Sequence, residues 1–342
     1  MKTERVKQLD FVRSISCIMI LFTHFNAVIA GYDGGSFLYP QNTPVPIYYG
    51  DIYLGNLGVS LFFILTGSSL YCSYKKNKPH LLQFYKKRFF AIYPMYWVAY
   101  FCFFSFYLLR NKALPRGTVT HFLINVFGFG GYCWSLSLCA GEYYYIGEWF
   151  LGCLLCIYLI FPLILNVYKR LKYMSFPLSV IVLLLLPSRN INILFINRIP
   201  EILFGIIYID YLSKVKSRYS IVAILFALLL FSARSMLDPF LYAVTVSMCL
   251  FFVFGIIGRV ITASKSLYLL IRWFSSLSYP VFLIHHQIIR LVLDSFDLRA
   301  ISAPLAWSLV FVCFFLIVLL SIVLRSVTTK TVSFFDNIFS ET

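Results

Sequence analysis

The sequence predicts an all-α, polytopic integral membrane protein with about ten transmembrane helices and both termini in the cytoplasm. Of its 342 residues, 61% are hydrophobic and only 12% are charged, whereas soluble domains average about 45–50% apolar and about 25% charged residues. Apolar runs long enough to cross a bilayer as helices recur along the whole chain. Lys and Arg gather in alternate connecting segments, which is typical of cytoplasmic loops.

The ten predicted spans follow from these apolar runs. They cover residues 11–30, 52–73, 89–109, 148–168, 174–187, 199–213, 219–235, 239–258, 277–293 and 304–325. The fifth and sixth are short, so we expect them to be tilted, broken or partly re-entrant. The aromatic and glycine-rich stretch 119–134 is interpreted as an interfacial or re-entrant piece rather than an eleventh span.

Charge sets the predicted orientation. With the N-terminus inside, roughly two thirds of the Lys and Arg residues fall in cytoplasmic segments, and this bias orients membrane proteins. The same bias explains the net charge of +16 without nucleic acid, and no basic-aromatic groove suggests a nucleic-acid partner. We expect residues 1–342 to form a single membrane domain, with no cleavable signal peptide and no fused extracytoplasmic domain.

The first predicted span carries residues that lipid-facing helices avoid. In "LDFVRSISCIMILFTHF", Arg13 and His24 lie about 20° apart around an α-helix and ~16 Å apart along it, and Asp10 is one turn before Arg13. A charge near the bilayer centre costs about 2.5–3.5 kcal/mol on insertion scales, so such residues usually face a bundle interior or a wet cavity. We interpret the stripe as functional. The alternative is that Arg13 reaches the inner headgroups and His24 bonds a neighbouring helix.

Polar residues also occur at the ends of later spans. Glu148 begins the fourth span between Tyr145 and Trp149, where the aromatic residues alone are typical of an interfacial belt. Arg198 and Glu201 lie one turn apart at the outer start of the sixth span, and a local ion pair is the simpler interpretation.

The ninth span contains a serine and two adjacent histidines. Ser278 lies near the inner surface, and His285 follows about two turns and ~10 Å higher on nearly the same face. Because adjacent residues on a helix point to different faces, we expect at most one of the two histidines to function.

The most basic inner loop reads "YKKNKPHLLQFYKKRFFAIYP" and contains Lys86, Lys87 and Arg88. Topology and attraction to anionic lipid are one explanation for its charge. The functional alternative is a site for phosphates, which Lys and Arg bind by charge and hydrogen bonds. A cytosolic coenzyme A thioester would suit such a site.

Six short motifs occur in one order along nearly the whole chain. Their residues are Leu9, Asp10, Arg13 and His24; Thr66 and Gly67 of "FFILTG"; Arg88 and Pro94 of "RFFAIYP"; Trp149, Tyr158 and Pro162; Arg198, Glu201 and Gly205; and Ser278, Tyr279, Pro280, Phe282, Leu283 and His285. In this arrangement the sequence resembles acyltransferase family 3, membrane-bound enzymes that O-acylate cell-surface glycans. Two positions depart from the family pattern. Ala91 replaces the second arginine of R-x-x-R, and Leu154 replaces a common glutamate.

The resemblance implies transfer of acetyl from cytosolic acetyl-CoA to a glycan hydroxyl outside. His24 would then be the general base or the acyl carrier, since an imidazole titrates near neutral pH. Arg13 would polarise the thioester or hold the donor, and Asp10 would orient Arg13. Glu148 or Glu201 would orient His24 or the sugar.

The remaining candidate residues divide between donor and acceptor. Lys86, Lys87, Arg88 and Ser278 are assigned to acetyl-CoA, and Trp149, Tyr145, Arg198 and His285 to the acceptor side. No metal is implied, because the five histidines form no H-x-x-x-H pattern and there is no carboxylate cluster. Membrane lipid is the expected surrounding partner.

Two other function classes are also compatible with the sequence. An exporter of a polysaccharide or lipid-linked glycan would also be polytopic with intramembrane charges, but neither an inverted repeat nor paired broken helices are visible in the sequence. A purely structural protein would need no polar track. We expect a multi-pass protein of a bacterial cell membrane that acts on a capsular polysaccharide, exopolysaccharide or O-antigen beside the polysaccharide biosynthesis machinery.

Overall fold

The computed structural model describes residues 6–340 apart from 34–35, 50, 114, 140, 186–192 and 217–218; for residues 220 and 334–340 it describes the backbone alone. The described chain is almost entirely helical, as predicted. Strands occur only as two short antiparallel hairpins among the described residues, β1 (Tyr32–Asp33) with β2 (Ser36–Phe37) and β3 (Tyr48–Tyr49) with β4 (Ile52–Tyr53).

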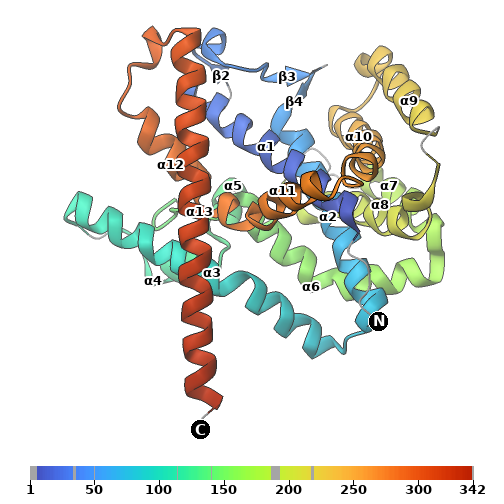
Figure 1. Cartoon of the computed structure of the whole chain (residues 1–342), viewed down its shortest axis with the longest axis horizontal. Coiled ribbons are helices and arrows are strands. Elements are labelled where there is room, and N and C mark those ends of the chain that lie inside the picture. Colours follow the sequence, from blue (N-terminus) through green and yellow to red (C-terminus); the bar gives the residue numbers. More distant parts are fainter. Residues whose placement is uncertain are drawn as a thin grey trace. The chain divides into compact units, whose positions relative to one another are not determined.

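Thirteen α-helices follow one another along the described residues (Figure 1). They are α1 (Lys7–Ile29), α2 (Leu54–Asn77), α3 (Leu81–Asn111), α4 (Val119–Val126), α5 (Gly130–Ser135), α6 (Glu148–Leu171), α7 (Ser175–Leu185), α8 (Ile199–Asp210), α9 (Ser220–Ser232), α10 (Pro239–Ile261), α11 (Lys265–Ser276), α12 (Ser278–Leu293) and α13 (Ala303–Ser340).

The number of membrane-capable helices is lower than the sequence suggests. Among the described residues, six helical segments are long and apolar enough to cross a membrane, or seven if α11 and α12 count as one broken span. The predicted fifth, sixth and seventh spans correspond to α7, α8 and α9, which have 11, 12 and 13 residues, fewer than the ~20 that a straight crossing needs. The end of the fifth lies outside the described residues. The count of ten and the position of the termini stay predictions.

The basic loop before the third span is largely helical, which corrects the sequence-based interpretation. α3 begins at Leu81 and includes Lys86, Lys87 and Arg88, because Leu, Gln, Lys and Arg are good helix formers. The true connection is short and starts at Lys78, a left-handed residue (φ 38°) that caps the end of α2. The three basic side chains are therefore positioned by a helix.

Contacts between Cα atoms divide the chain into two compact units. Unit 1 comprises Met1–Thr23, Pro46–Leu81 and Ile157–Ser276, and unit 2 comprises His24–Val45, Leu82–Cys156 and Leu277–Thr342. The prediction of a single domain stays a prediction.

Unit 1 is built on close contact between α2 and α8. A Cβ atom on Gly67 would lie 2.1 Å from the carbonyl oxygen of Ile202, and one on Gly205 would lie 2.1 Å from that of Ile64. Ser68 Oγ donates to the Gly205 carbonyl at 2.9 Å. Small residues allow helix backbones to approach in membranes, which gives a structural reason for the glycines in both motifs.

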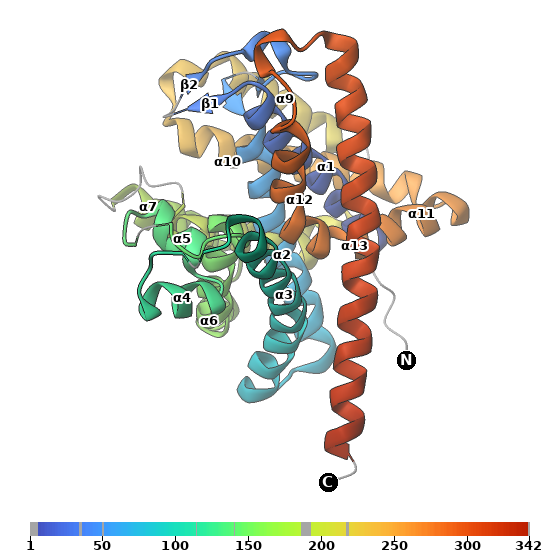
Figure 2. The same cartoon turned by 90° about the vertical axis from the view of Figure 1, so that its left-hand side faces the viewer.

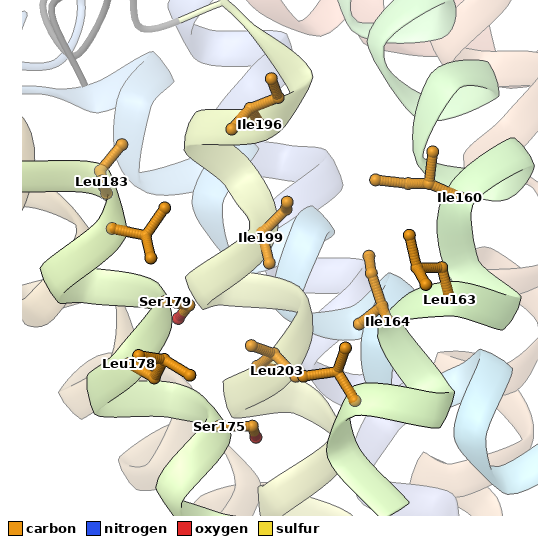
Figure 3. A pocket seen from close by; sticks show the side chains of 12 residues that line it. Ile160, Leu163, Ile164, Ser175, Leu178, Ser179, Leu183, Ile196, Ile199 and Leu203 are labelled. Carbon is orange, nitrogen blue, oxygen red and sulfur yellow. The ribbon is translucent and has the colours of Figure 1, made fainter. Parts of the chain in front are cut away.

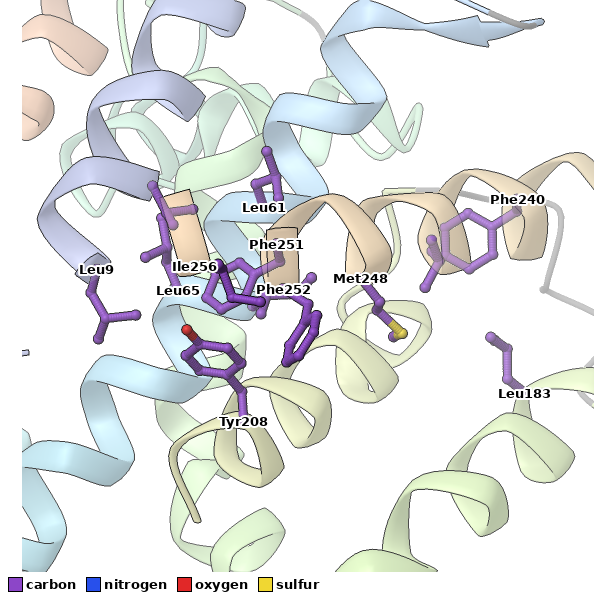
Figure 4. Packing of buried hydrophobic residues seen from close by; sticks show 13 residues of the cluster. Leu9, Leu61, Leu65, Leu183, Tyr208, Phe240, Met248, Phe251, Phe252 and Ile256 are labelled. Atoms are coloured by element: carbon purple, nitrogen blue, oxygen red, sulfur yellow. The ribbon is translucent and has the colours of Figure 1, made fainter. Parts of the chain in front are cut away.

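A hydrophobic cluster surrounds this contact in unit 1 (Figure 4). Buried side chains of α1, α2, α8 and α10 pack together, among them Leu65, Tyr208 and Phe251, and the rings of the last two meet edge to face at 4.9 Å. Full burial of such a side chain stabilises the fold by about 1.5–3 kcal/mol relative to leaving it exposed to water.

Unit 2 holds α3, α12 and the long α13, which runs beside α12 (Figures 1 and 2). Aromatic residues of α3 fix the connection that contains α4 and α5. Trp97 Nε1 donates to the Val126 carbonyl at 2.9 Å, Tyr100 OH donates to the Tyr143 carbonyl at 3.1 Å, and Tyr96 OH donates to Asn125. The stretch 119–134 thus forms two short helices rather than a span, as expected.

Candidate active site

Unit 2 brings three histidines and one glutamate together from distant parts of the sequence. His24 lies near the end of α1, Glu148 is the first residue of α6, and His285 and His286 lie in α12. The ring centroid of His24 is 4.7 Å from that of His285 and 5.0 Å from that of His286. Both neighbouring histidines therefore face His24, although the sequence suggested that only one would function. Residues about 100° apart on one helix can straddle the same neighbour.

Glu148 and His286 form a close pair, with Glu148 Oε1 and His286 Nδ1 2.5 Å apart. Both side chains are about one-fifth exposed, so the pair is largely shielded from solvent. A carboxylate is also favoured in the first turn of a helix, where it faces the positive end of the helix dipole. The arrangement orients His286 with Nδ1–H toward the carboxylate.

His285 has a different environment. Its Nδ1 lies 3.1 Å from the Val281 carbonyl oxygen and 2.9 Å from that of Phe282. Carbonyl oxygens only accept, so Nδ1 carries the hydrogen in neutral His285 and Nε2 carries a lone pair. That Nε2 is buried and has no hydrogen-bond partner among the described residues. His285 is thus a proton acceptor held against His24.

The spacing of this cluster also bears on metal binding. Ligand atoms of His24, Glu148 and His286 all lie within 4.8 Å of one another, the one such group in the part of the chain that the structure describes. Ligands of a tetrahedral zinc ion are separated by about 3.3 Å, given Zn–N distances of about 2.0–2.1 Å. Because Glu148 and His286 are closer than this, the observed geometry is that of a hydrogen-bonded pair.

Tyr144 joins the cluster from the loop before α6, where its phenol interacts electrostatically with the Glu148 carboxylate. Burial and the adjacent carboxylate raise the pKa of Tyr144 well above its usual range. The phenol therefore stays protonated beside the carboxylate.

Tyr145, which the sequence assigned to the acceptor side, stacks on Tyr107 with ring centroids 5.2 Å apart. Its carbonyl accepts a hydrogen bond from Gln287, the residue after His286. The loop before α6 is thus fastened to α12 beside the histidines. Trp149, assigned with it, follows Glu148 in α6 and contacts Phe150 with ring centroids 6.4 Å apart.

Arg13 and Asp10 are partners in unit 1. Arg13 Nη1 donates to Asp10 Oδ1 at 3.2 Å, and Nη2 donates to Ser69 Oγ at 3.1 Å. Ser275 Oγ bridges the pair, 3.3 Å from Arg13 Nη1 and 3.1 Å from Asp10 Oδ1. Asp10 is buried, whereas the Arg13 side chain is 25% exposed. The sequence motifs do not include Ser69 or Ser275. The only feature of the sequence that could have pointed to these two serines is that each lies within a few residues of a matched motif.

Arg198 and Glu201 form a local ion pair in unit 1, with Arg198 Nη1 and Glu201 Oε1 3.1 Å apart. Both side chains are fully buried, and the guanidinium lies 5.2 Å from the ring centroids of Phe63 and Phe240. Removing one partner of such a pair would leave an uncompensated buried charge. The simpler sequence interpretation, a local pair, describes this geometry.

The predicted donor residues lie in unit 2. Lys86 and Lys87 are exposed on α3, and Arg88 lies over the Phe84 ring at 5.8 Å. Ala91, where the family pattern has an arginine, lines a cavity of about 380 Å³ together with Thr328, Thr329 and Ser333 of α13. Ser278 begins α12.

A second cavity, of about 230 Å³, lies within unit 1 between α6, α7 and α8 (Figure 3). Its lining is apolar apart from Ser175 and Ser179, and both hydroxyls donate to backbone carbonyls at 2.6 Å. This lining suits a hydrocarbon chain and offers no free polar group for acyl transfer.

Comparison with known families supports one of the function classes. The model of acyltransferase family 3, described as an acyltransferase domain, matches residues 6–326. The chain belongs to this family. Neither a curated protein nor a solved structure matches the sequence. Membership implies a membrane acyltransferase and favours catalysis over export or a purely structural role.

Proposed function

We propose that the protein is a membrane O-acetyltransferase that moves an acetyl group from cytosolic acetyl-CoA to a hydroxyl of a cell-surface glycan. Family membership supports the acyltransferase class. The observation that carries the proposal is the position of His24, half-buried between two imidazoles and beside a carboxylate. Bacterial capsular polysaccharide, exopolysaccharide and O-antigen are the acceptor classes we propose.

His24 has two routes to this chemistry. As general base, it removes the proton of the sugar hydroxyl while the oxygen attacks the thioester carbonyl; the C–S bond breaks and the proton passes to the coenzyme A thiolate. As acyl carrier, its nitrogen attacks the thioester carbonyl, and the C–S bond breaks to release the thiolate. The sugar oxygen then attacks the acetyl carbon, the bond from His24 nitrogen to that carbon breaks, and the hydroxyl proton passes to the released thiolate. A positioned base contributes about 10²–10⁴-fold to rate, and both routes need His24.

The neighbours of His24 supply what either route requires. Positive charge develops on His24 in the transition state, and the Glu148 carboxylate lies close enough to stabilise it. The bare Nε2 of His285 can accept a hydrogen bond from protonated His24. His286 stays fixed by Glu148.

Donor binding is assigned to basic residues. Lys86, Lys87 and Arg88 would attract the phosphates of acetyl-CoA, and Ser278 would lie beside them in the donor site. Arg13, held by Asp10, Ser69 and Ser275, would polarise the thioester carbonyl. A fixed guanidinium favours a developing oxyanion most strongly where water is scarce.

Purified protein in lipid nanodiscs provides the test. Acetyl transfer from radiolabelled acetyl-CoA to de-O-acetylated surface polysaccharide is expected to fall at least about 10²-fold in His24→Ala. His121→Ala, which removes a histidine paired with Glu142, should retain activity. Full transfer by His24→Ala would reject the proposed mechanism, and transport of unmodified glycan by wild type would favour an exporter.

A further inference from the structure

Trp134 stands out on the connection between α4 and α6 because more than half of its large side chain is exposed (53%). Its indole Nε1 has no hydrogen-bond partner among the described residues. A tryptophan of this kind offers an apolar ring face and one donor. Ser135 and Ser137, on either side of the α5 end, are exposed as well.

The rest of the indole is held in place. Tyr144 lies against it, with ring centroids 5.7 Å apart and an interplanar angle of 33°. Gly141 also packs on the ring, since a Cβ atom there would be 3.5 Å from Trp134 Nε1. The side chain is thus supported on one side and open on another.

Helix α5 fixes Trp134 relative to the candidate active site. Gly131, one turn before Trp134, sits directly on the start of α6, because a Cβ atom there would be 2.9 Å from the Glu148 carbonyl carbon and from the Tyr144 ring. The following turn of α6 also packs against α5, since a Cβ atom on Gly152 would be 2.4 Å from Tyr132 Cβ. The helix that carries Trp134 is therefore packed against Glu148, the partner of His286.

A short chain of contacts joins the exposed indole to His24. Trp134 contacts Tyr144, and Tyr144 interacts electrostatically with Glu148. Gly131 packs against both Tyr144 and Glu148. Glu148 pairs with His286, whose ring lies 5.0 Å from that of His24. All of these residues belong to unit 2.

We propose that Trp134, supported by Tyr144, is the binding platform for a pyranose ring of the acceptor glycan. A pyranose presents a face of C–H groups, which matches the electron-rich face of an indole, and its hydroxyls can accept from Nε1. This inference rests on the proposed function, because it names where the acceptor of that reaction binds. The interfacial-belt explanation accounts for an exposed tryptophan but requires neither the support by Tyr144 nor the connection to Glu148.

Steady-state kinetics of the full chain in nanodiscs test the platform, with de-O-acetylated surface polysaccharide as acceptor. We expect Trp134→Ala to raise the KM for polysaccharide about tenfold, equivalent to about 1.4 kcal/mol. The KM for acetyl-CoA and the acceptor-independent hydrolysis of acetyl-CoA should not change. Trp134→Phe, which keeps an aromatic face, should recover most of the affinity.

Trp307→Ala is the matched control, because Trp307 is a similarly exposed tryptophan (41%) on α13 of unit 2. An unchanged acceptor KM in Trp134→Ala would overturn the platform. A lower yield of folded protein with unchanged KM would identify Trp134 as a lipid anchor instead, which also overturns it.

Direct binding separates this inference from the proposed function. Titration calorimetry with the same polysaccharide needs no acetyl transfer. If wild type transfers no acetyl yet binds polysaccharide in a Trp134-dependent way, the proposed function fails and the platform stands. If wild type and Trp134→Ala bind equally, or neither binds, the platform is wrong.

Discussion

Replacing Glu148 with Gln removes one negative charge from the cluster while keeping the shape of the side chain. Ligand atoms of Glu148 and His24 lie within 4.8 Å, and two unit charges at that distance interact by about 3.5 kcal/mol at an effective dielectric constant of about 20. Solvent reaches both side chains in part and weakens this attraction, so we set the transition-state stabilisation by Glu148 at about 3 kcal/mol. This energy corresponds to about 10²-fold in rate.

The expected result is a fall in kcat for acetyl transfer of about 10²-fold in Glu148→Gln, because His24 becomes positive only in the transition state. The KM for acetyl-CoA should change little. The amide oxygen of the introduced glutamine could still accept from His286, so the fold of the cluster should survive, and thermal unfolding in nanodiscs would check this.

Glu142→Gln is the matched control for this experiment. Glu142 is also paired with a histidine in unit 2, since its Oε2 lies 3.2 Å from His121 Nδ1, but it has no contact with His24 among the described residues. Its substitution should leave kcat within about twofold of wild type. A Glu148→Gln enzyme with wild-type kcat would refute the electrostatic reasoning.

Two further predictions concern unit 1. Gly67→Ala and Gly205→Ala should each lower the unfolding temperature in detergent or prevent accumulation, since either Cβ atom would lie 2.1 Å from a backbone oxygen. Gly58→Ala on α2 is the control and should be tolerated, because the atoms nearest to its Cβ would be side-chain atoms of Ile20 and Met19, at 3.0 Å and 3.4 Å. Equal stability of all three variants would contradict close packing of α2 and α8. Arg13→Lys should reduce acetyl transfer about tenfold or more, because an ammonium cannot reproduce the forked contacts to Asp10 and Ser69. The control is Arg234→Lys, since the exposed Arg234 pairs with Asp51 at 2.5 Å. Wild-type kinetics in Arg13→Lys would exclude Arg13 from the reaction.

The fold could be predicted where hydrophobicity alone decides it. The spans at 11–30, 52–73, 239–258 and 304–325 correspond to α1, α2, α10 and α13, because long apolar runs have few alternatives to helix in a membrane. Hydropathy does not report where a helix ends, so the helical start of α3 and the shortness of α9 are not predicted, whereas the fifth and sixth spans, α7 and α8, are short as expected. The helix α11 has polar residues at both ends and Arg272 within it, so its apolar run at 267–271 is too short to indicate a span.

The candidate site could be predicted only as separate residues. His24, Glu148 and His285 each stand out as polar residues at predicted spans, and the family motifs add weight to two of them. Their grouping depends on long-range packing that no spacing in the sequence encodes. The sequence does not single out His286, because adjacent residues on a helix point to different faces and only one of the two histidines is expected to function. Trp134 lies in the short helix α5, where nothing in the sequence separates it from an interfacial aromatic residue.

The most direct test of the central claim is proton NMR of the surface glycan from cells that carry wild type, a gene deletion, or His24→Ala at normal protein level. Spectra recorded before and after mild base identify O-acetyl methyl signals. If the protein is an O-acetyltransferase that uses His24, base-labile methyl signals are present in wild type and lost in both the deletion and His24→Ala. An unchanged ester pattern in His24→Ala, or a deletion that reduces surface glycan without altering its esters, would contradict it.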